Sequence, residues 1–154
     1  MSHQQPVSDH LESFAISAEA ETATKTRVSA RDFEFTVDEP ENLGGDDSAP
    51  TPVEYLSGAW AGCLTVVAYR VADEHDIQIE ALQIDIEGDL DPRKFLGIIE
   101  DSRPGYQELR VDVQIETDAE DAALSEWFAA VEERCPVGDN LSNETPVETT
   151  YTVQ

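Results

Sequence analysis

The 154-residue sequence predicts an α+β fold whose strands pair mostly in antiparallel fashion. Two observations lead to this class: apolar residues alternate with polar ones in several segments, and they recur every three or four positions in two others. The predicted order is two strands, a long helix, two strands, a second helix and a final strand. The first twelve residues are mostly polar, so we expect a flexible tail over residues 1–12. Because 40% of the residues are hydrophobic, which is enough for one core, we expect a single domain over residues 13–154.

The first two predicted strands lie in the N-terminal third of the chain. Apolar residues alternate with polar ones from Phe14 to Ala20, which is typical of a half-buried strand. A second alternating stretch runs from Arg27 to Val37, but its apolar positions change parity partway along. This change of phase predicts a turn or a bulge near residues 30–32.

A long loop and then a long helix follow. Three prolines and two adjacent glycines make residues 38–52 a loop. Thr51 is expected to cap the helix, with Pro52 at its first position and Glu54 completing a capping box, and the pattern ends near Asp73. The helix is expected to be central and buried. Its apolar stripe consists of Leu56, Trp60, Cys63 and Val67.

The second half of the chain predicts two strands, a helix and a closing strand. The first strand runs from Ile77 to Ile86 with a change of phase at Ala81, and residues 87–97 form a connection that lacks the ligand pattern of an EF-hand. Asp118 is expected to cap the following helix, which ends at Cys135. The remaining apolar positions are Val111, Val113 and Ile115 on one strand, Leu124, Trp127, Phe128 and Val131 on the helix, and Val147, Thr149, Tyr151 and Val153 on one face of the last strand.

The charge of the chain excludes several partners. A formal net charge of −25 leaves no basic surface for nucleic acid or for an anionic membrane. The carboxylates are spread along the whole chain, so we expect an acidic, halophilic-type surface suited to a salty cytoplasm, because their mutual repulsion opposes folding at low ionic strength. We find no pattern of a signal peptide in residues 1–20 and no transmembrane stretch, and therefore expect a cytoplasmic location with reduced thiols.

The two cysteines are the remaining candidates for chemistry. The sequence has no nucleophile elbow, no phosphate-binding glycine loop and no zinc-ligand spacing, so we expect neither a metal nor a cofactor. Cys63 and Cys135 each continue the apolar stripe of a helix, which makes contact between their thiols plausible. The alternative is a pair of inert core cysteines.

A reactive cysteine also needs a cation nearby, because only the thiolate attacks. Arg31 falls at the change of phase, where a bulge would aim it inward, and Arg27 is a second candidate. Glu54 could pair with the arginine, although it precedes Cys63 by nine positions and faces the other side of the helix, so that a second chain or a bent approach is needed. The alternative is that Arg31 is a surface residue and that Glu54 only caps the helix.

Two segments carry a resemblance to a known family. "RDFEFTVDEPENLGGDDSAPTPVEYLSGAWAGC" and "CPVGDNLSNETPVE" resemble the OsmC/Ohr family of thiol-dependent hydroperoxide reductases. The shared features are an arginine on an early strand, the "LGG" loop, the Pro-x-Glu helix start, the Ala-Gly-Cys helix centre and the second cysteine with its Pro-Val. The likeness covers roughly residues 13–154.

The resemblance implies an OsmC-like fold that forms an intertwined homodimer with active sites at the subunit interface. Cys63 would be the peroxidatic thiolate, Cys135 the resolving thiol, Arg31 (or Arg27) the activating cation and Glu54 its orienting partner. The implied activity is a peroxidase that reduces organic hydroperoxides, and in some cases hydrogen peroxide, through a Cys63 sulfenic acid and a Cys63–Cys135 disulfide.

The implied reductant of that disulfide is a dithiol of the lipoyl type. The apolar neighbours Trp60, Leu64 and Phe128 suit an organic peroxide. The alternative function is a non-catalytic dimer that senses redox state or binds a small hydrophobic ligand.

Overall fold

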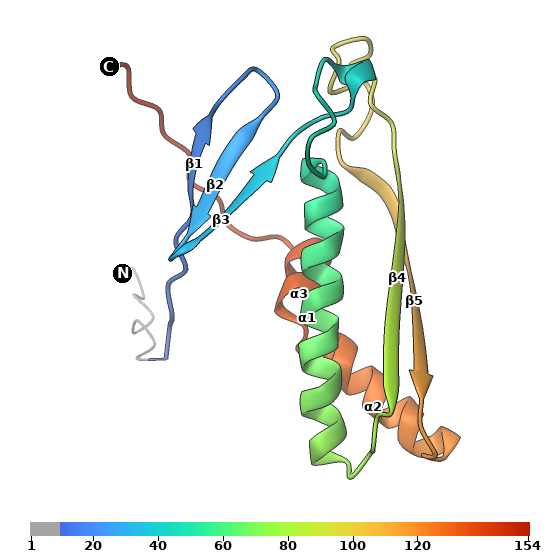
Figure 1. The fold of residues 1–154 in the computed structure, drawn as a ribbon. Coiled ribbons are helices and arrows are strands. Elements are labelled where there is room, and N and C mark those ends of the chain that lie inside the picture. Colours follow the sequence, from blue (N-terminus) through green and yellow to red (C-terminus); the bar gives the residue numbers. More distant parts are fainter. Residues whose placement is uncertain (1–9) are drawn as a thin grey trace, which may run out of the picture. The chain divides into compact units, whose positions relative to one another are not determined.

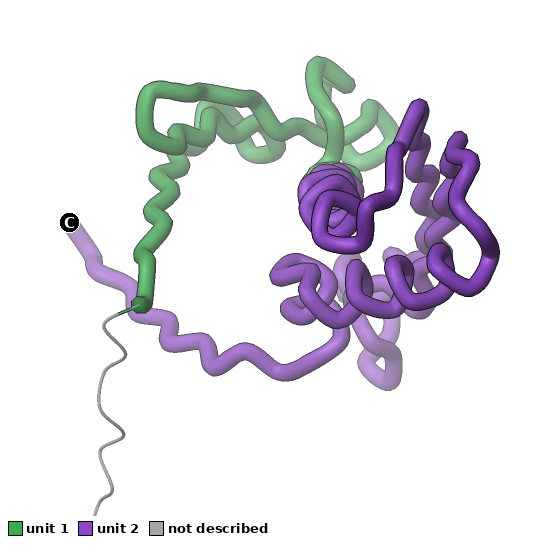
Figure 2. The backbone as a smooth tube through the Cα atoms, turned by 90° about the horizontal axis from the view of Figure 1, so that it is seen from below, with its two compact units in different colours: residues 1–55 green, residues 56–154 purple. Residues whose placement is uncertain are grey.

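The computed structural model describes residues 10–154, so most of the predicted tail over residues 1–12 lies outside the described residues. The chain falls into two compact units, Met1–Tyr55 and Leu56–Gln154, which Figure 2 distinguishes by colour. Each unit is described by itself below. The single domain expected over residues 13–154 stays a prediction.

The first unit contains a three-stranded antiparallel sheet in the order β1–β2–β3 (Figure 1). The predicted turn near residues 30–32 is confirmed. Ala30 pairs with Phe33, and the connecting residue Arg31 has a left-handed backbone with φ of 55°. Because β1 starts only at Ser17, the strand predicted from Phe14 is shorter than expected. The bounds are β1 Ser17–Ala20, β2 Thr26–Ala30 and β3 Phe33–Val37.

The loop after β3 is organised around the buried carboxylate of Asp38. It accepts hydrogen bonds from the Ser48 hydroxyl (2.7 Å) and the Ser48 N–H (3.0 Å), from the Glu39 N–H (2.8 Å) and from the Thr24 hydroxyl (3.1 Å). These bonds, led by those from Ser48, hold the pKa of Asp38 well below its usual range. A side chain at Gly45 would overlap the Glu39 carbonyl, which explains one glycine of this loop. A short 3₁₀ helix, η1, spans Glu41–Leu43.

Helix α1 (Pro52–Glu74) begins and ends within one residue of its predicted bounds. The predicted capping box is confirmed: the Thr51 N–H donates to Glu54 Oε2 (3.0 Å), and the Glu54 N–H donates to Thr51 Oγ1 (3.3 Å). Two orphan N–H groups of the helix terminus are thereby satisfied.

The second unit contains a long antiparallel hairpin of β4 (Ala81–Leu90) and β5 (Tyr106–Glu116). The strand predicted from Ile77 was placed too early. Ile77 is buried in the core ahead of the strand, and the strand continues to Leu90, through the first residues of the predicted connection. Pairing with β5 keeps these residues in a strand despite the low strand propensity of their polar and glycine-containing sequence.

Two helices follow the hairpin, one more than predicted. Helix α2 spans Asp121–Arg134, and Glu120 occupies its N-cap position without a capping hydrogen bond from the helix to its side chain, so the predicted cap at Asp118 is wrong. Helix α3 (Pro136–Ser142) was not predicted, because a helix of seven residues, about two turns, is too short to show an apolar period.

The predicted final strand is wrong for the single chain. Residues 143–154 form no regular element, and Val147, Tyr151 and Val153 are 82%, 92% and 85% exposed. The alternation of these residues is present, but a strand also needs a neighbour that completes its hydrogen bonds, and this segment pairs with no described strand.

The core of the second unit lies where α1 packs on α2 and on the hairpin, which runs alongside α1 in Figure 1. The indole N–H of Trp127 on α2 donates to the Ala68 carbonyl of α1 at 2.9 Å. The opposite side of α1 leaves Val66 71% and Tyr69 45% exposed, so burial of the helix on all sides is not found in the single chain. The buried residues are Leu64, Ala68, Val71, Ala72, Ile77, Trp127, Val131 and Cys135.

Candidate functional site

Cys63 and Cys135 meet inside the second unit. Their Sγ atoms lie 3.2 Å apart, with the Cys135 thiol donating to the Cys63 sulfur, and both cysteines are free thiols. Helical periodicity places both on inward faces, and the packing of α1 on α2 brings the two faces together. A disulfide bond of ~2.05 Å therefore needs the sulfurs to approach by only about 1 Å.

Cys135 is the more deeply buried of the two, with 2% of its surface exposed. It is the N-cap of α3, where its sulfur accepts the Gly138 N–H at 3.4 Å. Burial raises the pKa of the Cys135 thiol, so it remains protonated at neutral pH and acts as a hydrogen-bond donor. Cys63 is half-buried and packs against the core.

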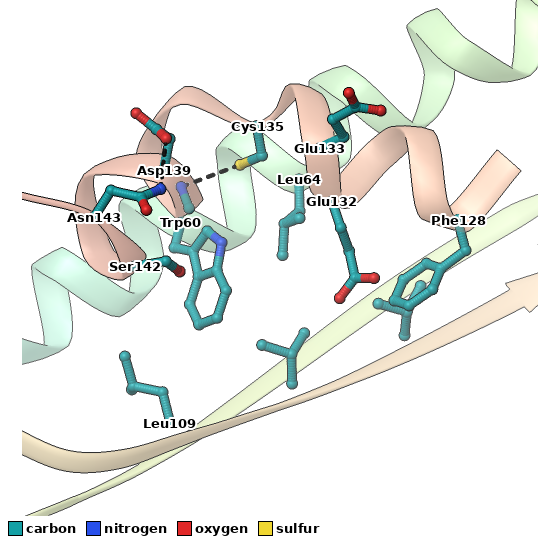
Figure 3. Close-up of a pocket in the computed structure, with 13 residues that line it drawn as sticks. Trp60, Leu64, Leu109, Phe128, Glu132, Glu133, Cys135, Asp139, Ser142 and Asn143 are labelled. Atoms are coloured by element: carbon teal, nitrogen blue, oxygen red, sulfur yellow. Dashed lines mark hydrogen bonds between the residues drawn. The ribbon is translucent and has the colours of Figure 1, made fainter.

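A pocket of about 480 Å³ opens beside Cys135. Trp60, Leu64 and Phe128, the apolar residues expected to suit an organic peroxide, all line it, but Cys63 is not among the lining residues. Figure 3 shows the Trp60 ring in the pocket and the Glu132 side chain directed toward the strands. The remaining lining residues are Leu109, Val111, Val113, Glu133, Cys135, Gly138, Asp139, Ser142 and Asn143.

Two features of this site were missed in the sequence. The indole Nε1 of Trp60 is buried and has no hydrogen-bond partner within residues 10–154. Gly138 lies against it: a Cβ at Gly138 would stand 3.0 Å from Trp60 Nε1 and 3.5 Å from Cys135 Sγ. The sequence signal was the spacing, since Trp60 precedes Cys63 by one helical turn and Gly138 follows Cys135 by three positions.

The other predicted site residues lie in the first unit. Arg31 is exposed on the β2–β3 turn, with its guanidinium 5.0 Å from the centre of the Phe33 ring. Arg27 forms ion pairs with carboxylates of the same sheet. Glu54 is occupied in the capping box. Of the predicted site residues, the structure thus brings together the two cysteines. The carboxylates paired with Arg27 are those of Glu19 (2.8 Å), Glu21 (3.5 Å) and Glu34 (3.9 Å).

Metal sites and membrane spans were both searched for among the described residues. Within residues 10–154 no three side chains of His, Cys, Asp or Glu gather in a way that could hold a metal ion. In the same range, no helix has the length and apolar character needed to cross a bilayer.

Several solved protein structures have a fold similar to that of this chain. The OsmC-like protein from Mycoplasma pneumoniae is 20% identical, with a TM-score of 0.73 over 84% of this chain and 87% of that chain. An organic hydroperoxide resistance protein, OsmC, from Legionella pneumophila is 19% identical, with a TM-score of 0.62 over 86% and 90%. An organic hydroperoxide resistance protein from Elizabethkingia anophelis is 16% identical, with a TM-score of 0.63 over 87% and 91%.

No curated protein sequence matches the chain. The family model described as OsmC-like protein matches residues 45–150, a range that includes both cysteines and well over half of the chain. The protein therefore belongs to the OsmC family.

Proposed function

We propose that the protein is a cysteine-based peroxidase that reduces organic hydroperoxides. The observation that carries the proposal is the pair of free thiols 3.2 Å apart, one of them donating to the other. A hydrogen bond from a protonated thiol stabilises a neighbouring thiolate, which is the reactive form of cysteine. The Legionella and Elizabethkingia proteins with the same fold are named for organic hydroperoxide resistance, which agrees with this chemistry.

Cys63 is the attacking residue in this proposal. Its thiolate attacks the terminal oxygen of the hydroperoxide, the O–O bond breaks, and the alkoxide leaves and takes a proton to become the alcohol. Cys63 is then a sulfenic acid. The Cys135 sulfur attacks the Cys63 sulfur, its thiol proton leaves with the hydroxide as water, and a Cys63–Cys135 disulfide forms. A dithiol then reduces this disulfide.

We propose further that the protein works as a homodimer. Large apolar side chains of α1 and of the C-terminal segment are exposed in the single chain. Their number is larger than the few scattered apolar residues that an ordinary protein surface carries. A second copy would cover them and would give the C-terminal segment a strand partner. The exposed residues are Leu56, Val66, Tyr69, Val147, Tyr151 and Val153.

The dimer also gives the arginine a route to Cys63. Arg31 or Arg27 from the first unit would stabilise the attacking thiolate by charge attraction, and Glu54 would orient the guanidinium. Arg27 already has three carboxylate neighbours, whereas Arg31 has the Phe33 ring. Separate Arg27→Gln and Arg31→Gln variants identify the activating residue as the one whose loss slows the reaction of Cys63 with peroxide.

The apolar pocket favours a second candidate function, a dimer that senses redox state or binds a small hydrophobic ligand without turnover. Turnover separates the two: a peroxidase consumes many equivalents of hydroperoxide when a dithiol is supplied, and a sensor or a ligand binder does not.

Cysteine variants test the proposed roles. Reduced wild-type protein, Cys63→Ser and Cys135→Ser are each mixed with cumene hydroperoxide, and peroxide loss is followed. We expect Cys63→Ser to lose the reaction, and Cys135→Ser to keep it and to leave a sulfenic acid that dimedone traps on Cys63. Consumption of peroxide by Cys63→Ser at the wild-type rate would show that the assignment is wrong.

A further inference from the structure

Within residues 10–154, the indole nitrogen of Trp60 is the one buried side-chain nitrogen or oxygen without a hydrogen-bond partner. An indole N–H is a donor only, and in buried tryptophans it usually finds an acceptor. This nitrogen is enclosed so closely that no water molecule has room beside it. An unpaired buried donor lowers stability, which calls for an explanation in the chemistry of the surrounding atoms.

The Cys135 sulfur shares a small space with this nitrogen. A Cβ built at Gly138 would stand 3.0 Å from Trp60 Nε1 and 3.5 Å from Cys135 Sγ, and the glycine has no side chain to place there. The Gly138 N–H already donates to the Cys135 sulfur at 3.4 Å. In Figure 3 the nitrogen of the Trp60 ring lies on the edge that faces Cys135. Two N–H groups, one bonded and one unpaired, therefore lie around the same sulfur.

We infer that the Trp60 N–H donates to the Cys135 sulfur when this sulfur loses its proton, and that it thereby speeds the closure of the Cys63–Cys135 disulfide. The inference rests on the proposed function, in which Cys135 is the second thiol to react. In the reduced protein the Cys135 thiol keeps its proton and donates a hydrogen bond to Cys63, with the sulfurs 3.2 Å apart. Loss of the proton makes the Cys135 sulfur anionic and a stronger acceptor, and a small movement into the space at Gly138 brings it and the indole within hydrogen-bond reach.

The other groups around Cys135 do little to stabilise its thiolate. The residues that line the pocket with Cys135 include three carboxylates of α2 and α3 and apolar side chains of β5, and none of these lining residues is Lys or Arg. On α1, Cys63 is itself the sulfur under attack. Arg134, the neighbour in sequence, forms an ion pair with Glu74 at 2.6 Å. Burial also raises the pKa of the Cys135 thiol, so neutral N–H donors are the groups that remain to offset the lost hydration of the anion. The carboxylates are those of Glu132, Glu133 and Asp139.

The Trp60 donor acts in the closing step alone. The Cys135 sulfur attacks the Cys63 sulfur, the S–S bond forms, the S–O bond of the sulfenic acid breaks, and hydroxide leaves and takes the Cys135 proton to become water. The Trp60 N–H stabilises the charge on the attacking sulfur, and the disulfide that results is neutral and a weaker acceptor. Attack of Cys63 on the hydroperoxide places no charge on Cys135, so the rate of that first step does not depend on the indole N–H.

The test separates the two steps without a peroxide. Reduced protein is mixed with one equivalent of dithiodipyridine, a disulfide whose cleavage changes the absorbance. Cys63, the more exposed thiol, displaces the first thiopyridine, and Cys135 then displaces the second from Cys63 as the protein disulfide closes. Cys135→Ser gives the first phase alone and so assigns the phases. Because peroxide takes no part, a failure of the proposed peroxidase activity and a failure of this inference are told apart.

Two changes remove the indole N–H. Trp60→Phe keeps an apolar ring, and Trp60→benzothienylalanine, introduced by suppression of a stop codon, keeps the shape of the indole with sulfur in place of the N–H. We expect both to slow the second phase at least about tenfold and to leave the first phase within about twofold of the wild type. Trp127→Phe is the control, because it removes the other indole of the same core, whose N–H donates to the Ala68 carbonyl, and it is expected to keep the wild-type second phase.

The pH profile distinguishes a donor from a residue that only fills space. Loss of a hydrogen bond to the thiolate makes the anion less stable, so the second phase of Trp60→Phe is expected to reach half of its maximal rate at a higher pH than that of the wild type. Altered packing alone would lower the rate by the same factor at every pH.

A benzothienylalanine protein that closes its disulfide at the wild-type rate would overturn the inference, because the size of the ring and not its N–H would then matter. Equal slowing by Trp127→Phe, an unshifted pH profile, or a wild type without a second phase would overturn it as well.

Discussion

Gly138 determines how closely the backbone of α3 approaches the thiol pair. A Cβ there would lie 3.0 Å from Trp60 Nε1, which is tighter than an ordinary contact, and 3.5 Å from Cys135 Sγ, which is an ordinary van der Waals distance. Relief of the contact with Trp60 shifts either the Trp60 ring or the start of α3, where Cys135 is the N-cap, and a shift of a few tenths of an ångström there changes the approach of the two sulfurs.

Gly138→Ala is therefore expected to slow disulfide formation roughly tenfold and to destabilise the fold by about 1 kcal/mol. Stopped-flow tryptophan fluorescence after peroxide addition measures the rate, and urea unfolding measures the stability. Gly105→Ala is the control, because its Cβ would meet only the Arg103 side chain, at 3.6 Å. A Gly138→Ala protein with the wild-type rate would show that this contact does not position Cys135.

The Asp38 carboxylate predicts a specific pH dependence. Its pKa is depressed in the folded state, so its stabilising effect is complete above the unfolded value of about 4 and is lost as the pH falls toward the folded value. Asp38→Asn keeps one acceptor oxygen and replaces the other with an NH2 donor, so it cannot accept the hydrogen bonds of Glu39 and of Ser48 together.

We expect the thermal midpoint of Asp38→Asn to lie well below that of the wild type at pH 6, and the gap to narrow from pH 4 downward. Glu41→Gln removes an exposed carboxylate of the same loop and is expected to change the midpoint little at any pH. A gap between wild type and Asp38→Asn that stays constant from pH 6 to pH 2.5 would contradict the role given to this carboxylate.

Among the elements, the C-terminal segment is the one whose sequence and single-chain structure disagree. Val147, Thr149, Tyr151 and Val153 alternate as a strand with one buried face, yet the segment forms no strand and these apolar side chains are exposed. A second copy would resolve the disagreement. One of its strands would complete the backbone hydrogen bonds of the segment, and its surface would cover the one apolar face.

Two double variants separate the faces of this segment. Tyr151→Asp with Val153→Asp places charges on the apolar face and is expected to dissociate the proposed dimer. Thr150→Asp with Thr152→Asp places the same charges on the other face and is expected to leave the proposed dimer intact. Light scattering after size exclusion measures the mass, and dissociation by both pairs or by neither would contradict the predicted pairing.

The elements show what the sequence can and cannot predict. Local signals were sufficient for the capping box of α1 at Thr51 and Glu54 and for the turn between β2 and β3, since both depend on neighbours in sequence. They were insufficient where tertiary pairing decides, as in the extension of β4 to Leu90. Helix α3, with seven residues, is too short to show an apolar period. Helical faces indicated that Cys63 and Cys135 both point inward, but the distance between their sulfurs and the pocket beside Cys135 depend on how the elements pack.

Across the whole molecule, charge is the dominant property. A net charge of −25 on 154 residues opposes compaction through repulsion that salt screens over a Debye length of about 10 Å at 0.1 M. The ion pairs of Arg27 with Glu19, Arg110 with Asp89 and Arg134 with Glu74 join exposed side chains, and such pairs contribute little stability.

We therefore expect the far-UV circular dichroism of the helices to diminish as salt is removed by dialysis and to return when KCl is added. Sucrose at matched osmolality is the control, because it leaves the charges unscreened. A protein that keeps its full helical signal without added salt would contradict the prediction of a salt-dependent fold.

The central claim is that the adjacent thiols are a working pair, and one measurement tests it most directly. Reduced protein receives one equivalent of cumene hydroperoxide, after which free thiols are counted and the peptides that contain Cys63 and Cys135 are weighed. We predict loss of both thiols and a single cross-linked peptide pair lighter by two hydrogens than the reduced peptides. Retention of both thiols, with the peroxide unconsumed, would contradict the account.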